Sequence, residues 1–328
     1  MRILVTGGAG YIGSHTVRML EKIADKVVVY DNLSKGHSAA VKNSELIVGD
    51  LFDKKLLSSV IEDYKIEAVI HFAAFSLVAE SMSNPKLYYH NNIQGTLSLL
   101  DTMLDCNVNK LVFSSTAAVY GEPEKMPITE EAVKNPTNVY GKTKLMMEQI
   151  MEDYSKVYDF NYIALRYFNA CGADEISDIG EDHYPESHLV PLVLQTCLGL
   201  RDSIKIFGTD YNTMDGSCVR DYIHVTDLAQ AHILALKALY NGSKSGAYNL
   251  GNGTGFSVKE IIAAAEEVTG INIKKEIADR RAGDPACLIA SSAKIKHELN
   301  WQPQYTNVKD IIESAWKWHK NNPQGYLK

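Results

Sequence analysis

Tyr140 and Lys144 are the two residues whose types and spacing most directly suggest chemistry. They stand four positions apart in the run Tyr140-Gly141-Lys142-Thr143-Lys144, so in a helix they share one face. A free phenol has a pKa of about 10 and is a poor base at neutral pH. A neighbouring ammonium favours the phenolate, which could take a proton from a hydroxyl while hydride leaves the same carbon. The spacing alone is equally compatible with a packed tyrosine beside a solvated lysine.

A hydroxyl-rich run, Ser114-Ser115-Thr116, stands at the end of a predicted strand and is a second candidate. Ligands of open α/β sheets bind beyond the carboxyl ends of the strands, so a hydroxyl there could donate to a reacting oxygen. Capping of the following turn is the competing structural interpretation.

A glycine turn, Thr6-Gly7-Gly8-Ala9-Gly10-Tyr11-Ile12-Gly13, joins a predicted strand to a predicted helix. Glycines at positions 7, 10 and 13 allow a sharp turn, close approach of a pyrophosphate and tight packing of the helix on the sheet. Asp31 ends the next predicted strand, 18 residues after Gly13, where a carboxylate would bind an adenosine ribose and repel a 2′-phosphate. The pattern predicts a dinucleotide site that prefers NAD to NADP, a preference that Lys35 could soften.

The elements that must position these residues alternate in the first half of the chain. Short β-branched runs and longer helical patterns follow one another, which is typical of βαβ crossovers and a parallel sheet. Turn signals become frequent after position 169. We therefore expect an α/β protein with a Rossmann-type doubly wound parallel sheet in residues 1–169, return segments at about 219–251, and a smaller substrate-binding α/β lobe in residues 170–328. Strands are predicted at 3–6, 26–30, 46–48, 68–72, 110–114 and 162–166, and long helices at about 86–107 and 137–157.

Composition excludes several functional classes. Forty acidic and 33 basic residues give a net charge of −7, which argues against a nucleic-acid partner. The sequence contains no run of about 20 apolar residues and no signal peptide before the first strand, so no membrane partner is expected. Five cysteines without a C-x-x-C pair indicate a reducing compartment, and a cytoplasmic location is expected.

The histidines are interpreted as structural. His15 and His71 read as packed residues of the first domain. His183 and His188 are read as lacking carboxylate or cysteine partners at ligand spacing, so no metal is expected.

Segments spread over nearly the whole chain resemble the extended branch of the short-chain dehydrogenase/reductase family. The late segments are more specific than the glycine turn. Three positions depart from common family members: Ser76 stands in place of lysine, His188 in place of asparagine and Thr116 in place of serine. The matching segments are 7–13, 31–33, 72–74, 88–92, 114–121, 140–144, 166–169, 215–216, 219–225 and 280–284.

The resemblance implies NAD as cofactor, a UDP-sugar as substrate, and a homodimer in which the two long helices pair across a two-fold axis. It implies inversion at C4 of UDP-glucose and UDP-galactose through a 4-keto intermediate, as in galactose metabolism. The implied catalytic set is Tyr140, Lys144 and Thr116. The implied cofactor-binding residues are Gly7, Gly10, Tyr11, Ile12, Gly13, Asp31, Asn32, Ser34, Lys35, Gly36, Asp50, Leu51, Phe72, Ala73, Ala74, Ser76, Asn91 and Phe168.

Residues implied to hold the UDP-sugar come mainly from the second half of the chain. Arg220 and Arg281 are the cations that a diphosphate needs, because guanidinium matches phosphate oxygens bidentately. A surface ion pair is the competing interpretation for such an arginine. The implied substrate-binding residues are Thr116, Tyr140, Asn169, His188, Leu189, Phe207, Arg220, Tyr222, Arg281, Asp284 and Cys287.

Cys287 bears on substrate range. Alignment through Arg281 and Asp284 puts it beside the 2-substituent of the sugar, where some family members carry tyrosine. A thiol is much smaller than a phenol ring, so the chain is also expected to accept UDP-GlcNAc and UDP-GalNAc. The competing interpretation is a small buried apolar residue.

Three alternative functions are weighed against this one. A nucleotide-sugar dehydratase or decarboxylase of the same family is disfavoured because Ala117-Ala118, not an acidic pair, follows Thr116. A net oxidoreductase would accumulate free NADH. A dinucleotide sensor would have no need of Tyr140 and Lys144.

Overall fold

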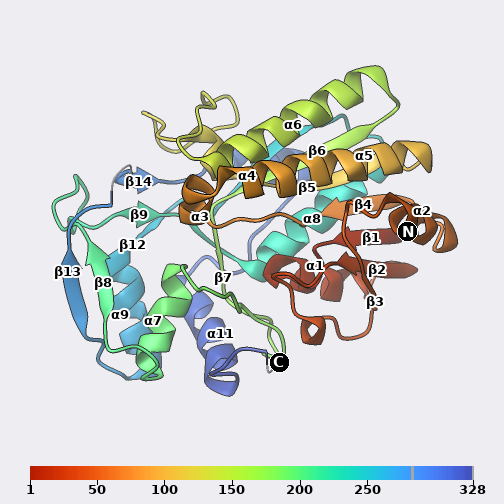
Figure 1. The fold of residues 1–328 in the computed structure, drawn as a ribbon. Coiled ribbons are helices and arrows are strands. Elements are labelled where there is room, and N and C mark those ends of the chain that lie inside the picture. Colours follow the sequence, from red (N-terminus) through yellow and green to blue (C-terminus); the bar gives the residue numbers. More distant parts are fainter. Residues whose placement is uncertain (282–283, 327–328) are drawn as a thin grey trace.

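The central sheet has seven parallel strands in the order β3-β2-β1-β4-β5-β6-β11 (Figure 1). The computed structural model describes residues 1–281 and 284–326. The strand order reverses between β1 and β4, which is the doubly wound arrangement, so the predicted fold class and strands are confirmed. In sheet order the strands are β3 (Glu45–Val48), β2 (Lys26–Asp31), β1 (Arg2–Thr6), β4 (Ala68–His71), β5 (Lys110–Thr116), β6 (Asn161–Tyr167) and β11 (Gly246–Leu250).

Two helical layers cover the sheet because successive strand residues point to opposite faces. Ile3 and Val5 of β1 pack in a core with α1 and α8, whereas Leu4 packs in a core with α2, α5 and α6. The first layer contains α1 (Tyr11–Leu20), α8 (Val225–Tyr240) and α10 (Ala293–Leu299), and the second contains α2 (Lys54–Asp63), α5 (Gly95–Asp105) and α6 (Val139–Val157).

The predicted helix at 86–107 is continuous but not uniform. It begins as α4 (Pro85–Tyr88), widens into a π-helical segment η2 (Tyr89–Gln94) and continues as α5. The short α3 (Val78–Ser83) precedes it, and α6 contacts α3, α4 and η2. This packing places the N-terminal end of α6 beside the residues that follow β4.

The C-terminal lobe surrounds a third core formed by α7 (Leu189–Cys197), α9 (Val258–Thr269) and α11 (Val308–Asn321) (Figure 1). Small sheets complete it and bring distant segments together. They pair β7 (Asn169–Cys171) with β10 (Tyr222–His224), β8 (Ile204–Phe207) with β13 (Lys275–Ala278), and β12 (Phe256–Ser257) with β9 (Val219–Arg220) and β14 (Cys287–Leu288). Two 3-10 turns are η1 (Ser38–Ala40) and η3 (Ala117–Tyr120).

The chain returns to the sheet domain twice. Strand β11 pairs with β6, within the predicted return segment. In addition, α10 packs against α8 and β11, and Trp301 lies in the same core, although the predicted division assigns them to the second domain. The indole of Trp301 donates to the carbonyl of Asp227 at 3.0 Å. The exact division into two domains stays a prediction.

Among the residues that the structure describes, no helix is both long enough and apolar enough to cross a membrane.

Candidate functional site

The glycine turn between β1 and α1 brings backbone atoms too close together for side chains. Gly7 has φ +72°, and a Cβ there would lie 2.4 Å from the nitrogen of Ala73. A Cβ on Gly13 would lie 2.3 Å from the carbonyl oxygen of Gly7. Gly10 precedes α1 without a side-chain cap, so the first N–H groups of the helix are available to an anion.

Asp31 lies at the carboxyl end of β2, as predicted. Its carboxylate accepts hydrogen bonds from the N–H groups of Ala9 at 3.0 Å and Leu33 at 2.8 Å. Burial raises the pKa of this carboxyl group, and these two hydrogen bonds oppose the increase. Asp31 therefore also ties the glycine turn to the neighbouring loop, where Asn32 donates to Asp50 at 2.7 Å.

One cavity of about 1250 Å³ extends from the glycine turn to the C-terminal lobe. A pocket for a single drug-sized ligand has about 300–1,000 Å³, so this cavity has room for more than one such ligand. Every residue predicted to bind the cofactor lines it, as do Thr116, Tyr140 and Lys144. The predicted substrate residues that line it are Asn169, His188, Arg220, Arg281 and Asp284.

Four predicted substrate residues do not line this cavity in the described part of the chain. Tyr222 is buried in the third core, and Leu189 packs against that core. Phe207 lies 4.0 Å from the guanidinium of Arg281 and so contacts a residue that lines the cavity. Cys287 is half-buried in β14, where the neighbouring cavity wall is formed by Asp284, Pro285 and Leu288. Ala282 and Gly283, which belong to the matching segment 280–284, lie outside the described residues.

Tyr140 and Lys144 share one face of α6 near its N-terminal end, which is capped by Asn138. The ammonium of Lys144 donates to the carbonyl of Ser114 at 2.7 Å and lies 4.8 Å from the ring centre of Phe113. Burial lowers the pKa of Lys144 to about 7, with Glu148 opposing the change.

Tyr140 differs from the expectation of a phenol acidified by Lys144. Burial raises its pKa to about 12, and a hydrogen bond with Thr116 opposes this increase. Desolvation of the phenolate is therefore the larger effect on the pKa of Tyr140, and the hydrogen bond with Thr116 is the smaller one. Thr116 also accepts from the N–H of Ala118 at 3.2 Å, so it caps η3 as well as facing the cavity.

The arginines of the C-terminal lobe are held in place by its small sheets. Arg220 donates to the carbonyl of Val219 at 2.8 Å and forms an ion pair with Asp284. Arg220 and Asp284, which are both predicted to bind the substrate, therefore also pair with one another. The side chain of Asn169 donates to the backbone carbonyl of Asp221 at 2.8 Å, so it is likewise held by the lobe.

Apart from His188, sequence reasoning missed the segment 181–188, most of which lines the cavity between the two lobes. The interpretation that His183 and His188 lack carboxylate partners was wrong. His183 lies 3.3 Å from Glu181, and His188 lies 3.0 Å from both Glu181 and Glu186. The alternation Glu181-x-His183 and Glu186-x-His188 is the signal that could have revealed the group.

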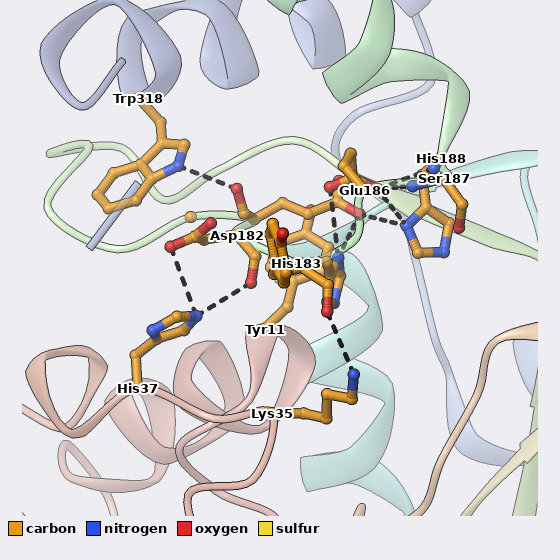
Figure 2. Close-up of polar contacts among 12 residues, drawn as sticks. Tyr11, Lys35, His37, Asp182, His183, Glu186, Ser187, His188 and Trp318 are labelled. Atoms are coloured by element: carbon orange, nitrogen blue, oxygen red, sulfur yellow. Dashed lines mark hydrogen bonds and ion pairs between the residues drawn. The ribbon is translucent and has the colours of Figure 1, made fainter. Parts of the chain in front are cut away.

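Ion pairs between histidines and glutamates set the pKa values of the histidines in this segment. Burial alone would lower the pKa of His188, but the charges and hydrogen bonds of Glu181 and Glu186 outweigh it and raise the pKa to about 10. The pKa of His183 also rises, to about 9, because the same two carboxylates favour its protonated form. Figure 2 shows Lys35 and His37 reaching from the first domain to this segment, where they contact the carbonyls of Tyr184 at 3.2 Å and Asp182 at 3.1 Å.

Two histidine interpretations are confirmed. His71 is buried between the hydroxyls of Thr6 at 2.7 Å and Thr96 at 3.0 Å. His15 is buried, and its Nδ1 lies 2.8 Å from the carbonyl of Tyr11.

Comparison with known proteins gives one consistent family. The model of the NAD dependent epimerase/dehydratase family matches residues 3–251. A UDP-glucose 4-epimerase of Halalkalibacterium halodurans is 54% identical over 99% of this chain and 98% of its own length. A solved UDP-glucose 4-epimerase structure is 55% identical with a TM-score of 0.98, covering 100% of both chains. The UDP-Glc/GlcNAc 4-epimerase of Campylobacter jejuni is 43% identical with a TM-score of 0.86, covering 98% of this chain and 99% of that one.

Proposed function

Because the chain belongs to the NAD dependent epimerase/dehydratase family, we propose that it acts as a UDP-glucose 4-epimerase, an isomerase that interconverts UDP-glucose and UDP-galactose. The observation that carries this proposal is the single cavity in which the glycine turn, the Tyr140–Lys144 pair and the two arginines of the C-terminal lobe meet. Relatives with this activity match the chain along nearly its whole length.

The first half of the cavity suits NAD. The glycine turn offers backbone N–H groups and leaves no room for a Cβ at Gly7 or Gly13, which permits close approach of a pyrophosphate. Asp31 and Asn32 would meet the adenosine ribose at the end of β2. When bound, NAD⁺ supplies the hydride acceptor for C4 of the sugar.

Tyr140 is proposed as the base that takes the proton of the 4-hydroxyl as C4 loses its hydride, which leaves a 4-keto sugar. Proton and hydride both return to the sugar after it has turned over. The phenolate must be stabilised against burial, and the nicotinamide charge together with Lys144 would provide this. Thr116 would donate to the reacting oxygen. Arg220 and Arg281 would hold the diphosphate, so the hexose could rotate while the nucleotide stays anchored.

N-acetylated UDP-hexoses are proposed as additional substrates. The argument rests on the small thiol of Cys287 in β14 and on the resemblance to the Campylobacter jejuni UDP-Glc/GlcNAc 4-epimerase. Cys287 stands between the cavity-lining residues Pro285 and Leu288 in the sequence, and Cys287→Tyr would take up space beside this part of the cavity. The variant should suppress UDP-GalNAc conversion and spare UDP-galactose. Equal losses on both substrates, or an inactive wild type with UDP-GalNAc, would contradict the proposal.

A homodimer is proposed, formed by the 85–105 helix and α6 of each protomer. Both elements expose apolar side chains, including Tyr89, Met146, Val157 and Tyr158. Light scattering on the purified protein tests this. A cytoplasmic location is proposed because all five cysteines are free thiols, as expected in a reducing compartment.

The central experiment uses the purified protein without added cofactor. Denaturation should release NAD, and UDP-galactose should convert to UDP-glucose by NMR without accumulation of free NADH. Stoichiometric NADH would indicate a net oxidoreductase, and a 4-keto-6-deoxy product would indicate a dehydratase. Release of NAD without any sugar conversion would favour the dinucleotide sensor.

A further inference from the structure

Four side chains of the segment 181–188 form a compact group of nitrogen and oxygen atoms. Glu181, His183, Glu186 and His188 each offer one ligand atom, and these atoms lie within 4.8 Å of one another. The two glutamates are almost fully buried, with side-chain exposures of 4% and 6%. Figure 2 shows the labelled members close together beneath α7.

We propose that this group binds one Zn²⁺ ion, with two imidazole nitrogens and two carboxylate oxygens as ligands. Zinc prefers four such ligands in a tetrahedron, whereas Mg²⁺ and Ca²⁺ prefer oxygen alone. The inference does not depend on the proposed epimerase reaction: it assigns the ion a structural role and gives His188 to the ion rather than to the UDP-sugar.

The observed separations already approach those of a zinc tetrahedron. Bonds of about 2.0–2.1 Å place neighbouring ligand atoms about 3.3 Å apart. Nδ1 of His183 lies 3.3 Å from Glu181 and 3.5 Å from Glu186, and Nδ1 of His188 lies 3.0 Å from each glutamate. The other separations in the group reach at most 4.8 Å, so those side chains must move closer together to surround an ion.

One further observation favours a ligand over ion pairs alone. Nδ1 of His183 is buried and makes no aligned hydrogen bond despite its carboxylate neighbours.

The ion would restrict the motion of the segment 181–188, which contacts both lobes. Glu181 and Asp182 accept from Trp318 of α11 and His37 of the first domain through their backbone carbonyls. Tyr184 accepts from Lys35, which lines the cavity beside the glycine turn. Zinc bound here would therefore stiffen the cavity wall and raise the thermal stability of the holoenzyme.

The experiment measures the metal directly. Tag-free protein from zinc-supplemented medium should contain about one zinc per chain by elemental analysis, with an X-ray absorption shell of nitrogen and oxygen at about 2.0–2.1 Å. His183→Asn and Glu186→Gln should each reduce the zinc content to background. His297→Asn, at an exposed histidine of α10, is the matched control and should retain the ion.

A second measurement uses only the wild-type protein, so it remains informative if the variants fail to fold. A chelator should lower the unfolding temperature of wild-type protein, and Zn²⁺ but not Mg²⁺ should restore it. Wild type that stays at background zinc after titration would overturn the proposal and leave an ion-pair network. Zinc retained by the His183→Asn/Glu186→Gln double variant would also overturn it, because the ion would then lie elsewhere.

Discussion

Two groups of polar side chains line the same cavity, but their pKa values shift for different reasons. At Tyr140 and Lys144, burial dominates: the pKa of the phenol rises to about 12 and that of the ammonium falls to about 7. In the segment 181–188, burial also acts, yet the pKa of His188 rises to about 10 and that of Glu186 falls. The difference lies in partners within ion-pair distance, which offset desolvation only in the second group. The first group is suited to exchanging a proton and the second to holding charge in place.

Tyr140→Phe gives the largest expected effect and tests the proton-exchange half of this comparison. The variant removes only the hydroxyl, so turnover of UDP-galactose should fall about 10²–10⁴-fold while NAD remains bound. Turnover is followed by NMR, and cofactor content by absorbance after denaturation. A variant that kept more than about a tenth of the wild-type rate would show that Tyr140 is not the base.

Arg166→Met tests whether a paired buried charge stabilises the fold near the first group. Arg166 donates to Glu148 at 2.6 Å and to Tyr120 at 2.7 Å, and both charged side chains are buried. Leaving Glu148 unpaired should cost about 3–5 kcal/mol of the free energy of unfolding, measured by urea denaturation.

The matched control is Lys156→Met, which removes an exposed pair with Glu152 on the same helix. It should change stability far less, because solvent screens that pair. If the two variants lowered the free energy of unfolding equally, burial would not determine how much these ion pairs stabilise the protein.

Lys144→Met tests the effect of burial on Lys144 through the pH dependence of stability. The pKa of Lys144 is lowered to about 7 from 10.5, so between these values the unfolded chain binds more protons than the folded one. The contribution of Lys144 to stability is therefore most favourable above pH 10.5 and is lost as the pH falls toward 7. Wild type should gain stability relative to Lys144→Met as the pH rises through this window. A difference in unfolding free energy that stays constant with pH would contradict the burial effect.

The same variant should shift the pH–rate profile to higher pH, since it removes the positive charge that Lys144 carries up to its pKa of about 7. An unchanged profile would remove the electrostatic role assigned to Lys144.

Lys35→Met gives the smallest expected effect and tests the contact between the cofactor loop and the segment 181–188. It removes the hydrogen bond to the carbonyl of Tyr184. NAD affinity should weaken by up to about fivefold, equivalent to about 1 kcal/mol. Fluorescence titration of cofactor-free protein measures this, and tighter binding in the variant would contradict a supporting role for the contact.

Local patterns in the sequence predicted six of the seven strands and the glycine turn with Asp31, whereas the other cofactor residues were implied by the family resemblance. The β-branched run that became β1 alternates between two cores, and the glycines of the turn stand where a Cβ would collide with the backbone. The four-residue spacing of Tyr140 and Lys144 places both on one helix face, as helix geometry requires. These features depend on neighbours within a few positions, so the sequence by itself determined them.

Only the tertiary structure decided the charges and partners of the site. The ion pair of Arg220 with Asp284 joins residues 64 positions apart, and the contact of Lys35 with Tyr184 joins residues 149 apart. The raised pKa of Tyr140 follows from burial by several elements, which a local spacing does not record. Even Glu181 and His188, close in sequence, meet only because the segment folds back between the lobes. Desolvation and ion pairing depend on distances in space, and packing of remote segments sets those distances.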